Sequence, residues 1–304
     1  MSAGAAAHHD LFVFDTDERL GEHGAPFVEG GLDAGESIVV VLDASHTNVL
    51  RDALGARSDA VTFIDREGFY TTPEAALAGY DGVLRRLRAG GAPGVRCFGE
   101  LPRIATRRDY DRWIAYDAIL NRAMARHQVW IRCAYDARDV PPDVIAEARS
   151  AHPHELLGDS LSSVHGPAPE DVVRAMTPAP EPLPELAPIA AGDAVALRRL
   201  LREALGAAGV SDDPASQLLL AAAEVVANAR RHGRGAVTVR AGRVGRRFAC
   251  EIADEGAGVT DPMAGFVPPA PDDGQGAGLW VARQVTEQLE VLHTPGGSAV
   301  RLWV

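Results

Sequence analysis

Residues 221–233 read AAAEVVANARRHG, and this stretch decides which fold we expect for the second half of the chain. It spaces an acid, an amide and a histidine four residues apart: Glu224, Asn228 and His232. On an α-helix this spacing places the three side chains along one face. The other residues are mainly alanine and valine, which are typical of a buried helix surface. Such a polar stripe belongs either to a solvated helix face or to a binding site, and the stretch alone does not separate the two.

Two glycine-rich segments follow this helix, each next to a regular element. DEGAGV (254–259) ends a strand-like run, and GQGAGL (274–279) leads into a helical pattern. Glycines before a helix leave backbone N–H groups free to bind phosphate, and the helix dipole adds to the attraction. A strand-end carboxylate, Asp254, is suited to accept a hydrogen bond from an amine such as that of adenine. Each motif alone is common, but the order ExxxNAxxH, DxGxG and GxGxGL within about 60 residues is specific.

The three motifs together resemble the GHKL ATPase superfamily, and within it the anti-sigma-factor serine kinases of bacteria. The resemblance covers residues 190–304. It implies an α+β (Bergerat) sandwich, with helices on one mostly antiparallel sheet, that binds ATP together with Mg²⁺. The sequence pattern agrees, because it predicts helices over 192–208 and 214–232 and paired antiparallel strands over 236–256.

By motif, the resemblance implies a role for each polar residue and glycine of this site. Glu224 would be the general base and Asn228 the Mg²⁺ ligand, while Asp254 would accept the adenine amine. The other residues would surround the nucleotide: Gly256 and Gly258 as the floor of the adenine pocket; Gly274, Gly276 and Gly278, followed by Leu279, as the hinge of the ATP lid and the phosphate cradle; and Arg231 and His232 near the nucleotide.

The lid departs from the family pattern. Residues 259–278 contain no arginine or lysine and three acidic residues, whereas a basic lid residue can reach the γ-phosphate in such kinases. Phosphoryl transfer depends on positioning and charge stabilisation. The sequence therefore predicts ATP binding and leaves a slow kinase and a nucleotide-dependent binding protein as alternatives. Arg283, in the following helix, is the nearest candidate for the missing cation.

The first half of the chain alternates strand-like and helix-like segments. Continuous β-branched runs such as SIVVVL (37–42) are typical of strands that are buried on both faces. Their alternation with amphipathic stretches predicts an α/β domain with a mainly parallel sheet. The expected strands are 11–14, 37–42, 60–65, 94–100 and 129–136, and the expected helices are about 17–33, 45–55, 73–90, 107–127 and 140–153.

Residues 7–165 are similar to the MEDS (DcmR-like) sensory domain, which is proposed to sense small molecules in bacterial regulators. The resemblance is carried by HHDLFVF, FVEGGLDAGESIVVVL, CFGELP and CAYDARDVPPDVIAEARSAHPHEL. An open α/β sheet binds ligands at the carboxyl ends of its strands. This nominates Asp15, Asp43, Asp65, Glu100, Tyr135 and Asp136, although we favour a helix-cap or turn role for the first three.

His8 and His9 are candidate metal or haem ligands, but a solvated chain start is the favoured interpretation. A metal site needs further ligands, and none follows at a useful spacing. Cys97, Cys133 and Cys250 lie in separate apolar runs. They are expected to be buried, reduced thiols and neither disulfides nor a metal site.

A proline-rich segment separates the two halves. TPAPEPLPELAP (177–188) contains five prolines in twelve residues, which favours an extended, semi-rigid linker. We therefore expect a sensory domain over 7–165, a linker over 166–189 and the ATPase domain over 190–304.

The composition excludes several function classes. The net charge of −12 argues against direct nucleic-acid binding. All 30 basic residues are arginine, so a P-loop lysine and a Schiff-base lysine are excluded. No signal peptide and no apolar run long enough to span a bilayer is seen, so a cytoplasmic protein without membrane association is expected.

These features predict a signalling switch in which the first domain senses a small molecule or partner and the second binds Mg·ATP. By resemblance, the partners would be a sigma factor and an anti-anti-sigma (STAS) protein with a phosphoacceptor Ser or Thr, and the chain would form a homodimer. Two alternatives remain: a non-catalytic scaffold that uses ATP as a conformational ligand, and a sensor histidine kinase. A sensor histidine kinase needs a helical hairpin with a phosphoacceptor histidine before the ATPase domain. Residues 150–190 contain His152, His154 and His165, but this segment is too short and too proline-rich to form such a hairpin.

Overall fold

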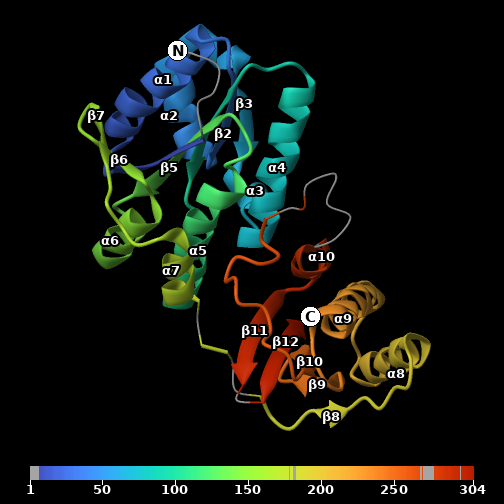
Figure 1. Ribbon diagram of the computed structural model, residues 1–304. Coiled ribbons are helices and arrows are strands. Elements are labelled where there is room, and N and C mark those ends of the chain that lie inside the picture. Colours follow the sequence, from blue (N-terminus) through green and yellow to red (C-terminus); the bar gives the residue numbers. More distant parts are fainter. Residues whose placement is uncertain (1–6, 178, 181–182, 268, 270–276, 295) are drawn as a thin grey trace. The chain divides into compact units, whose positions relative to one another are not determined.

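The computed structural model describes residues 7–177, 179–180, 183–267, 269, 277–294 and 296–304. The chain forms two compact units, residues 1–178 and 179–304, and each is described by itself (Figure 1). Within the described residues, no helix is both long and apolar enough to cross a membrane. The three cysteines are buried free thiols, as predicted.

The first unit is built on a seven-stranded sheet with the order β3-β2-β4-β5-β1-β6-β7. All neighbouring pairs are parallel except β6 and β7, which form an antiparallel hairpin. The prediction of a mainly parallel sheet is therefore confirmed. Its strands are β1 (His8–Phe14), β2 (Ser37–Leu42), β3 (Thr62–Asp65), β4 (Val95–Glu100), β5 (Val129–Asp136), β6 (His154–Leu157) and β7 (Ser160–Ser163).

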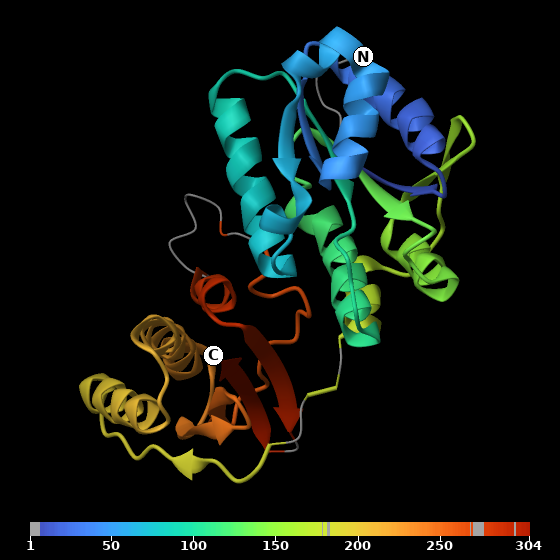
Figure 2. The same cartoon turned by 180° about the vertical axis from the view of Figure 1, so that it is seen from behind.

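Helices cover both faces of this sheet (Figures 1 and 2). Threonine and aspartate side chains cap several helix starts, as Thr16 and Asp43 do when they accept a backbone N–H three residues further on. On one face lie α1 (Asp17–Asp33) and α2 (Ala44–Leu54). On the other lie α4 (Pro73–Ala89), α5 (Arg107–Ala123), α6 (Pro142–Ala151) and α7 (Pro169–Met176). The short α3 (Arg66–Phe69) follows β3, and a 3₁₀ turn covers Gly55–Ala60.

Strand alternation gives each face of the sheet its own set of side chains. On one face, Phe12, Val40 and Phe98 pack against α1 and α2 in an apolar core. On the other face, Cys133 and Tyr135 of β5 point toward α5, where both reach the carboxylate of one α5 residue. Both faces thus carry buried polar groups beside their apolar cores: a buried Asp10–Arg132 ion pair on the side of α1 and α2, and a polar cluster around the α5 carboxylate on the other.

The segment expected to be a linker is partly structured. Helix α7 lies within 166–189 and packs against α5 and α6, with Val172 and Val173 each 2% exposed. Further along, the two-residue strand β8 (Ala187–Pro188) pairs with the second sheet. Apolar residues on both sides of the prolines therefore join the adjacent cores, and the extended connection is shorter than expected.

The second unit is an α+β sandwich, as predicted. Its five-stranded sheet has the order β11-β12-β10-β9-β8, and every neighbouring pair is antiparallel. Three helices pack through leucines, valines and alanines on one face. The elements are α8 (Ala194–Ala207), α9 (Asp212–His232), β9 (Thr238–Val244), β10 (Arg247–Asp254), α10 (Ala277–Val285), β11 (Gln288–Thr294) and β12 (Gly297–Trp303).

Candidate functional site

Helix α9 buries one face and leaves its polar stripe at the edge of the core. Leu218, Val225 and Val226 are buried against the sheet. Glu224 and Asn228 are partly buried, while Arg231 and His232, near the end of the helix, are exposed. The stripe therefore passes from the margin of the core to solvent, which suits a site that is open at one end.

The first turn of α10 lies directly against this stripe. A Cβ added to Gly278 would lie 2.8 Å from Asn228 Nδ2 and 3.0 Å from Glu224 Oε2. Any larger residue here would have to displace the end of at least one of these side chains, so glycine gives the closest approach. The structure thus brings together Glu224, Asn228 and the N-terminus of a helix, whose free N–H groups favour an anion. Gly274 and Gly276 lie outside the described residues, and Leu279 is partly buried beside Gly265.

Asp254 closes the other side of the site, at the end of β10. Its Oδ1 accepts the backbone N–H of Gly256 at 2.7 Å. Ser298 Oγ donates to Oδ2 at 3.4 Å. A carboxylate has about four lone-pair positions, so Asp254 keeps acceptor capacity for a further donor. A Cβ on Gly233, directly after α9, would lie 2.5 Å from Oδ1, which places this carboxylate at the C-terminal end of α9.

The two glycines after Asp254 are required by close packing. A Cβ on Gly256 would lie 2.6 Å from Asp254 Oδ1 and 3.0 Å from Gly233 Cα. Gly258 has a φ of +71°, and its Cβ would overlap the side chain of Ser298. The loop therefore holds its backbone between the end of α9 and the start of β12. This rigid backbone fixes the direction of the Asp254 carboxylate.

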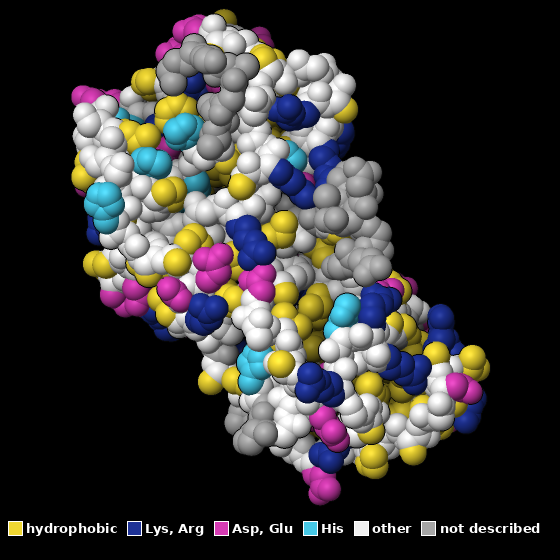
Figure 3. Space-filling model, in the orientation of Figure 1, with side chains coloured by type: hydrophobic (Ala, Val, Ile, Leu, Met, Phe, Trp, Pro, Cys, Tyr) yellow, Lys and Arg dark blue, Asp and Glu magenta, His cyan; other side chains and the backbone are white. Residues whose placement is uncertain are grey.

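Positive charge near this site comes from α9 and the residues just after it. Arg230, Arg231 and Arg234 are exposed there. The dark-blue side chains in Figure 3 are all arginines, because the sequence contains no lysine, and several lie on the surface of the second domain. Long-range attraction of an anionic ligand is therefore supplied by arginines outside the lid.

Arg283 does not take the role of the missing lid cation. Its side chain is 8% exposed, and its guanidinium lies 3.7 Å from the centre of the Phe266 ring. Nε donates to the carbonyl of Ala264 at 3.1 Å, and one terminal nitrogen donates to the carbonyl of Leu289 at 3.4 Å. The prediction that Arg283 substitutes for a lid cation is not supported, because this charge holds the first part of the lid, at Ala264 and Phe266, against α10.

The nominated strand-end residues of the first domain fall into two groups. Asp43 and Asp65 are the N-caps of α2 and α3, which is the role we favoured for them. Asp15 is exposed, and Thr16 caps α1 in its place. Glu100 and Asp136, in contrast, are buried and line a cavity of about 410 Å³ at the carboxyl ends of β4 and β5. That is where ligands bind in open α/β sheets.

Arg66 also lines this cavity, and His46 and Arg138 contact its buried carboxylates; none of the three was singled out from the sequence. Arg66 donates to Glu100 and is itself 2% exposed. His46 Nδ1 lies 3.0 Å from Glu100 Oε2, and this hydrogen bond raises the pKa of His46. Arg138 pairs with Asp136 at 2.7 Å. These residues come from α2, α3 and the loop after β5, so no spacing in the sequence relates them.

The remaining nominee, Tyr135, points to the opposite face of the sheet. Its hydroxyl donates to Asp117, and burial raises its pKa. His9, His152 and Cys133 lie near the same carboxylate. Burial lowers the pKa of His9 and of His152 to about 4, and it raises the pKa of Asp117 to about 6. Both imidazoles are therefore neutral near pH 7.

Comparisons with known proteins agree with this division. Residues 8–153 match the MEDS family, described as the MEthanogen/methylotroph, DcmR Sensory domain, and residues 188–304 match the histidine kinase-like ATPase domain. The two family matches, a sensory domain and a histidine kinase-like ATPase domain, indicate a signalling protein. The chain is a MEDS sensory domain joined to a histidine kinase-like ATPase domain, as the resemblance predicted.

Two solved structures share limited similarity with the chain. The histidine kinase domain of the E. coli osmosensor EnvZ is 21% identical, covers 41% of this chain and 91% of its own, and has a TM-score of 0.25. The histidine kinase domain of the Erythrobacter litoralis EL346 blue-light activated histidine kinase is 13% identical, with 66% and 87% coverage and a TM-score of 0.25. No curated protein matches the chain.

Proposed function

We propose that the second domain binds Mg·ATP. It phosphorylates a Ser or Thr of an anti-anti-sigma (STAS) protein, or it holds a sigma factor. A small polar ligand bound by the first domain controls this activity. One observation carries this proposal: Gly278, at the start of α10, lies directly against Glu224 and Asn228. The carboxylate proposed as the base, the amide proposed as the Mg²⁺ ligand and a helix N-terminus, which favours anions, are therefore close together.

Each of these residues has a definite task in the proposed reaction. The amide oxygen of Asn228 would complete the coordination of Mg²⁺, whose other ligands are phosphate oxygens and water. The carboxylate of Glu224, one turn earlier, would accept the proton of the attacking hydroxyl. Asp254 would accept a hydrogen bond from the adenine amine. Exposed Arg231 and His232 would lie beside the phosphates or the partner.

The test is transfer of label from [γ-³²P]ATP to the protein that co-purifies with the full chain. Glu224→Gln keeps the shape of the side chain and removes the base, so labelling should fall at least about 100-fold with ATP binding retained. Glu203→Gln is the matched control, because Glu203 is an exposed acid on the neighbouring helix α8, paired with Arg199. Undiminished labelling by Glu224→Gln would overturn the general-base assignment.

A second candidate is a non-catalytic protein that uses ATP as a conformational ligand. The acidic lid favours it, and so does the engagement of Arg283 with the carbonyls of Ala264 and Leu289. Phosphoryl transfer without a cation at the γ-phosphate would be slow. Tight ATP binding without turnover or a labelled partner would favour this candidate, and steady transfer to a partner would reject it.

The partner and the oligomeric state can be measured together. Pull-down of the full chain with and without Mg·ATP, followed by mass spectrometry, identifies a sigma factor or STAS protein if this proposal is correct. Light scattering tests the expected homodimer.

A histidine kinase is disfavoured, because His152 is buried and the only described helix between α6 and α8 is the eight-residue α7.

A further inference from the structure

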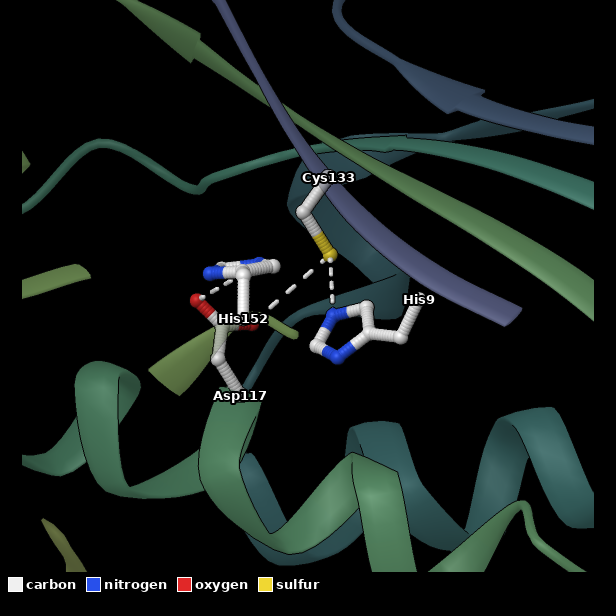
Figure 4. A group of neighbouring side chains, drawn as sticks. All are labelled: His9, Asp117, Cys133 and His152. Atoms are coloured by element: carbon white, nitrogen blue, oxygen red, sulfur yellow. Dashed lines mark hydrogen bonds and ion pairs between the residues drawn. The ribbon is translucent and has the colours of Figure 1, made fainter. Parts of the chain in front are cut away.

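Four side chains with metal-ligating atoms meet inside the first domain, away from the cavity described above. His9 comes from β1, Cys133 from β5, Asp117 from α5, and His152 follows the end of α6 (Figure 4). Their side chains converge from three elements and one helix end, although they are up to 143 residues apart, from 9 to 152. All four are buried, with at most 9% of each residue exposed.

The four ligating atoms lie within 4.8 Å of one another, and three of the distances between them are close to those of a tetrahedral ion. His9 Nε2 lies 3.2 Å from Cys133 Sγ. Cys133 Sγ lies 3.7 Å from Asp117 Oδ1, and His152 Nε2 lies 3.8 Å from Asp117 Oδ2. A tetrahedral zinc site with bonds of about 2.0–2.3 Å has ligand–ligand distances of about 3.3–3.8 Å. The cluster therefore needs little rearrangement to hold an ion.

The hydrogen bonds outside the cluster orient both imidazoles for ligation. His152 Nδ1 bonds to the Ala148 carbonyl at 2.8 Å, so this nitrogen carries the proton and Nε2 has the lone pair. Asn121 Nδ2 donates to the Ala151 carbonyl at 2.8 Å, which leaves Asn121 Oδ1 to accept from His9 Nδ1 at 3.0 Å. His9 Nε2 therefore also directs its lone pair at the cluster. Such outer hydrogen bonds are typical of histidine metal ligands.

One atom of the cluster is left unsatisfied. His152 Nε2 is buried and has no hydrogen-bond partner among the residues that the structure describes. Its lone pair faces a carboxylate oxygen of Asp117, which is itself an acceptor. Two acceptors that face each other in a buried site repel, and a buried polar atom without a partner requires an explanation. A cation between Asp117 and His152 supplies it.

A cysteine nucleophile is the competing explanation, since Cys133, His9 and Asn121 form a Cys–His–Asn chain. Such a nucleophile must reach a substrate carbonyl. The cavity beside Cys133 has a volume of only about 10 Å³, roughly the space of one water. It has no room for a substrate, and a nucleophile also leaves His152 Nε2 unexplained.

We propose that the first domain binds one divalent transition-metal ion of the zinc class through His9 Nε2, His152 Nε2, Cys133 Sγ and a carboxylate oxygen of Asp117. Imidazole and thiolate ligands select zinc or cobalt over magnesium or calcium. The ion displaces the proton of the Cys133 thiol to solvent and is separate from the magnesium expected with ATP. The site does not depend on the proposed kinase function.

Cobalt is the probe, because tetrahedral Co²⁺ with a thiolate ligand has intense visible bands and a sulfur-to-cobalt charge-transfer band in the near ultraviolet. The full chain is stripped with a chelator and titrated with Co²⁺. We expect about one ion per chain and both spectral features. Cys133→Ala should lose the charge-transfer band, while Cys97→Ala, an equally buried cysteine on the neighbouring strand β4, should retain it.

Further variants keep the test decisive if Cys133→Ala does not fold. Excess Zn²⁺ should raise the melting temperature of the stripped wild type, and His152→Gln and Asp117→Asn should each weaken this response at least about ten-fold in Zn²⁺ concentration. Mg·ATP binding reports that the second domain is intact. The proposal is overturned if folded wild type retains no Co²⁺, if Co²⁺ binds without the thiolate band, or if Cys97→Ala loses the band as well.

Discussion

Gly278 shows how one residue links the packing of the second domain to its proposed chemistry. Gly278→Ala places a methyl group 2.8 Å from Asn228 Nδ2 and 3.0 Å from Glu224 Oε2, so one or both side chains must move. We expect the affinity for Mg·ATP, measured by calorimetry, to fall at least about ten-fold, which corresponds to about 1.4 kcal/mol. The fold should persist, because the displaced side chains lie at the edge of the core.

The matched control is Gly206→Ala in α8. An added Cβ at Gly206 meets nothing within 4 Å. Alanine is favoured over glycine inside a helix by up to about 1 kcal/mol, so this variant should be at least as stable as wild type. Equal ATP affinities for Gly278→Ala and wild type would show that the start of α10 does not contact the nucleotide.

His46 predicts a pH dependence for the stability of the first domain. The hydrogen bond to Glu100, with further attraction from Asp43 and Asp136, raises the pKa of His46 above 6.5, and the cost of burial opposes this only in part. A raised folded-state pKa means that the stabilisation is complete below pH 6.5 and is lost as the pH rises through the folded-state value. The free-energy difference between wild type and His46→Gln, measured by denaturant unfolding, should therefore shrink from pH 6 to pH 9. A difference that stays constant over this range would contradict the ion-pair interpretation.

The candidate residues differ in how far the sequence could reveal them. Glu224 and Asn228 are on one helix, so helical periodicity alone places them together. His9 and Cys133 become neighbours only because β1 pairs with β5, with Leu11 opposite Cys133. Strand order depends on long-range packing, which no local pattern encodes. For this reason His9 had no visible companion ligand in the sequence.

At the scale of elements, α7 shows where composition misleads. Its segment lies just before the proline-rich run and was expected to be linker, yet Pro169 occupies the first turn, where proline is tolerated. Val172 and Val173 then supply the buried contacts to α5 and α6. The longer elements, such as β2 and α5, were predicted because their apolar pattern extends over several residues. The short strands β6, β7 and β8 contain too few residues to show one.

This role of α7 can be tested by truncating one of its valines. Val173→Ala removes two buried methyl groups and should lower the unfolding free energy of the first domain by about 2 kcal/mol. Val195→Ala in α8 is the matched control, because Val195 is 80% exposed, and it should change stability by less than about 0.5 kcal/mol. Urea unfolding of the full chain gives both values. Equal effects of the two substitutions would mean that α7 is not part of the folded unit.

At the scale of the whole molecule, the two units have separate hydrophobic cores. One core lies between the first sheet and its helices α1 and α2, and the other between the second sheet and α8, α9 and α10. Two cores joined by a short proline-rich segment are expected to unfold in two calorimetric transitions. Tryptophan fluorescence assigns them in variants that keep one pair only, since Trp113 and Trp130 are in the first unit and Trp280 and Trp303 in the second.

Control of one domain by the other requires that these transitions share free energy. Mg·ATP at about 100 times its dissociation constant should stabilise the second unit by about 2.7 kcal/mol. If the first domain regulates ATP binding, linkage is reciprocal, and ATP must also shift the first transition by a coupling energy of about 1–3 kcal/mol. Differential scanning calorimetry of the full chain measures both shifts. At the same ATP concentration, Gly278→Ala with a ten-fold lower affinity should reduce both together, the shift of the second unit to about 1.4 kcal/mol. A ligand shifts an equilibrium only if it binds one of the two states more tightly than the other. A shift of the second transition alone would therefore mean that ATP binding is not coupled to the first domain. The domains would then be merely tethered, and the sensory domain would act on the partner.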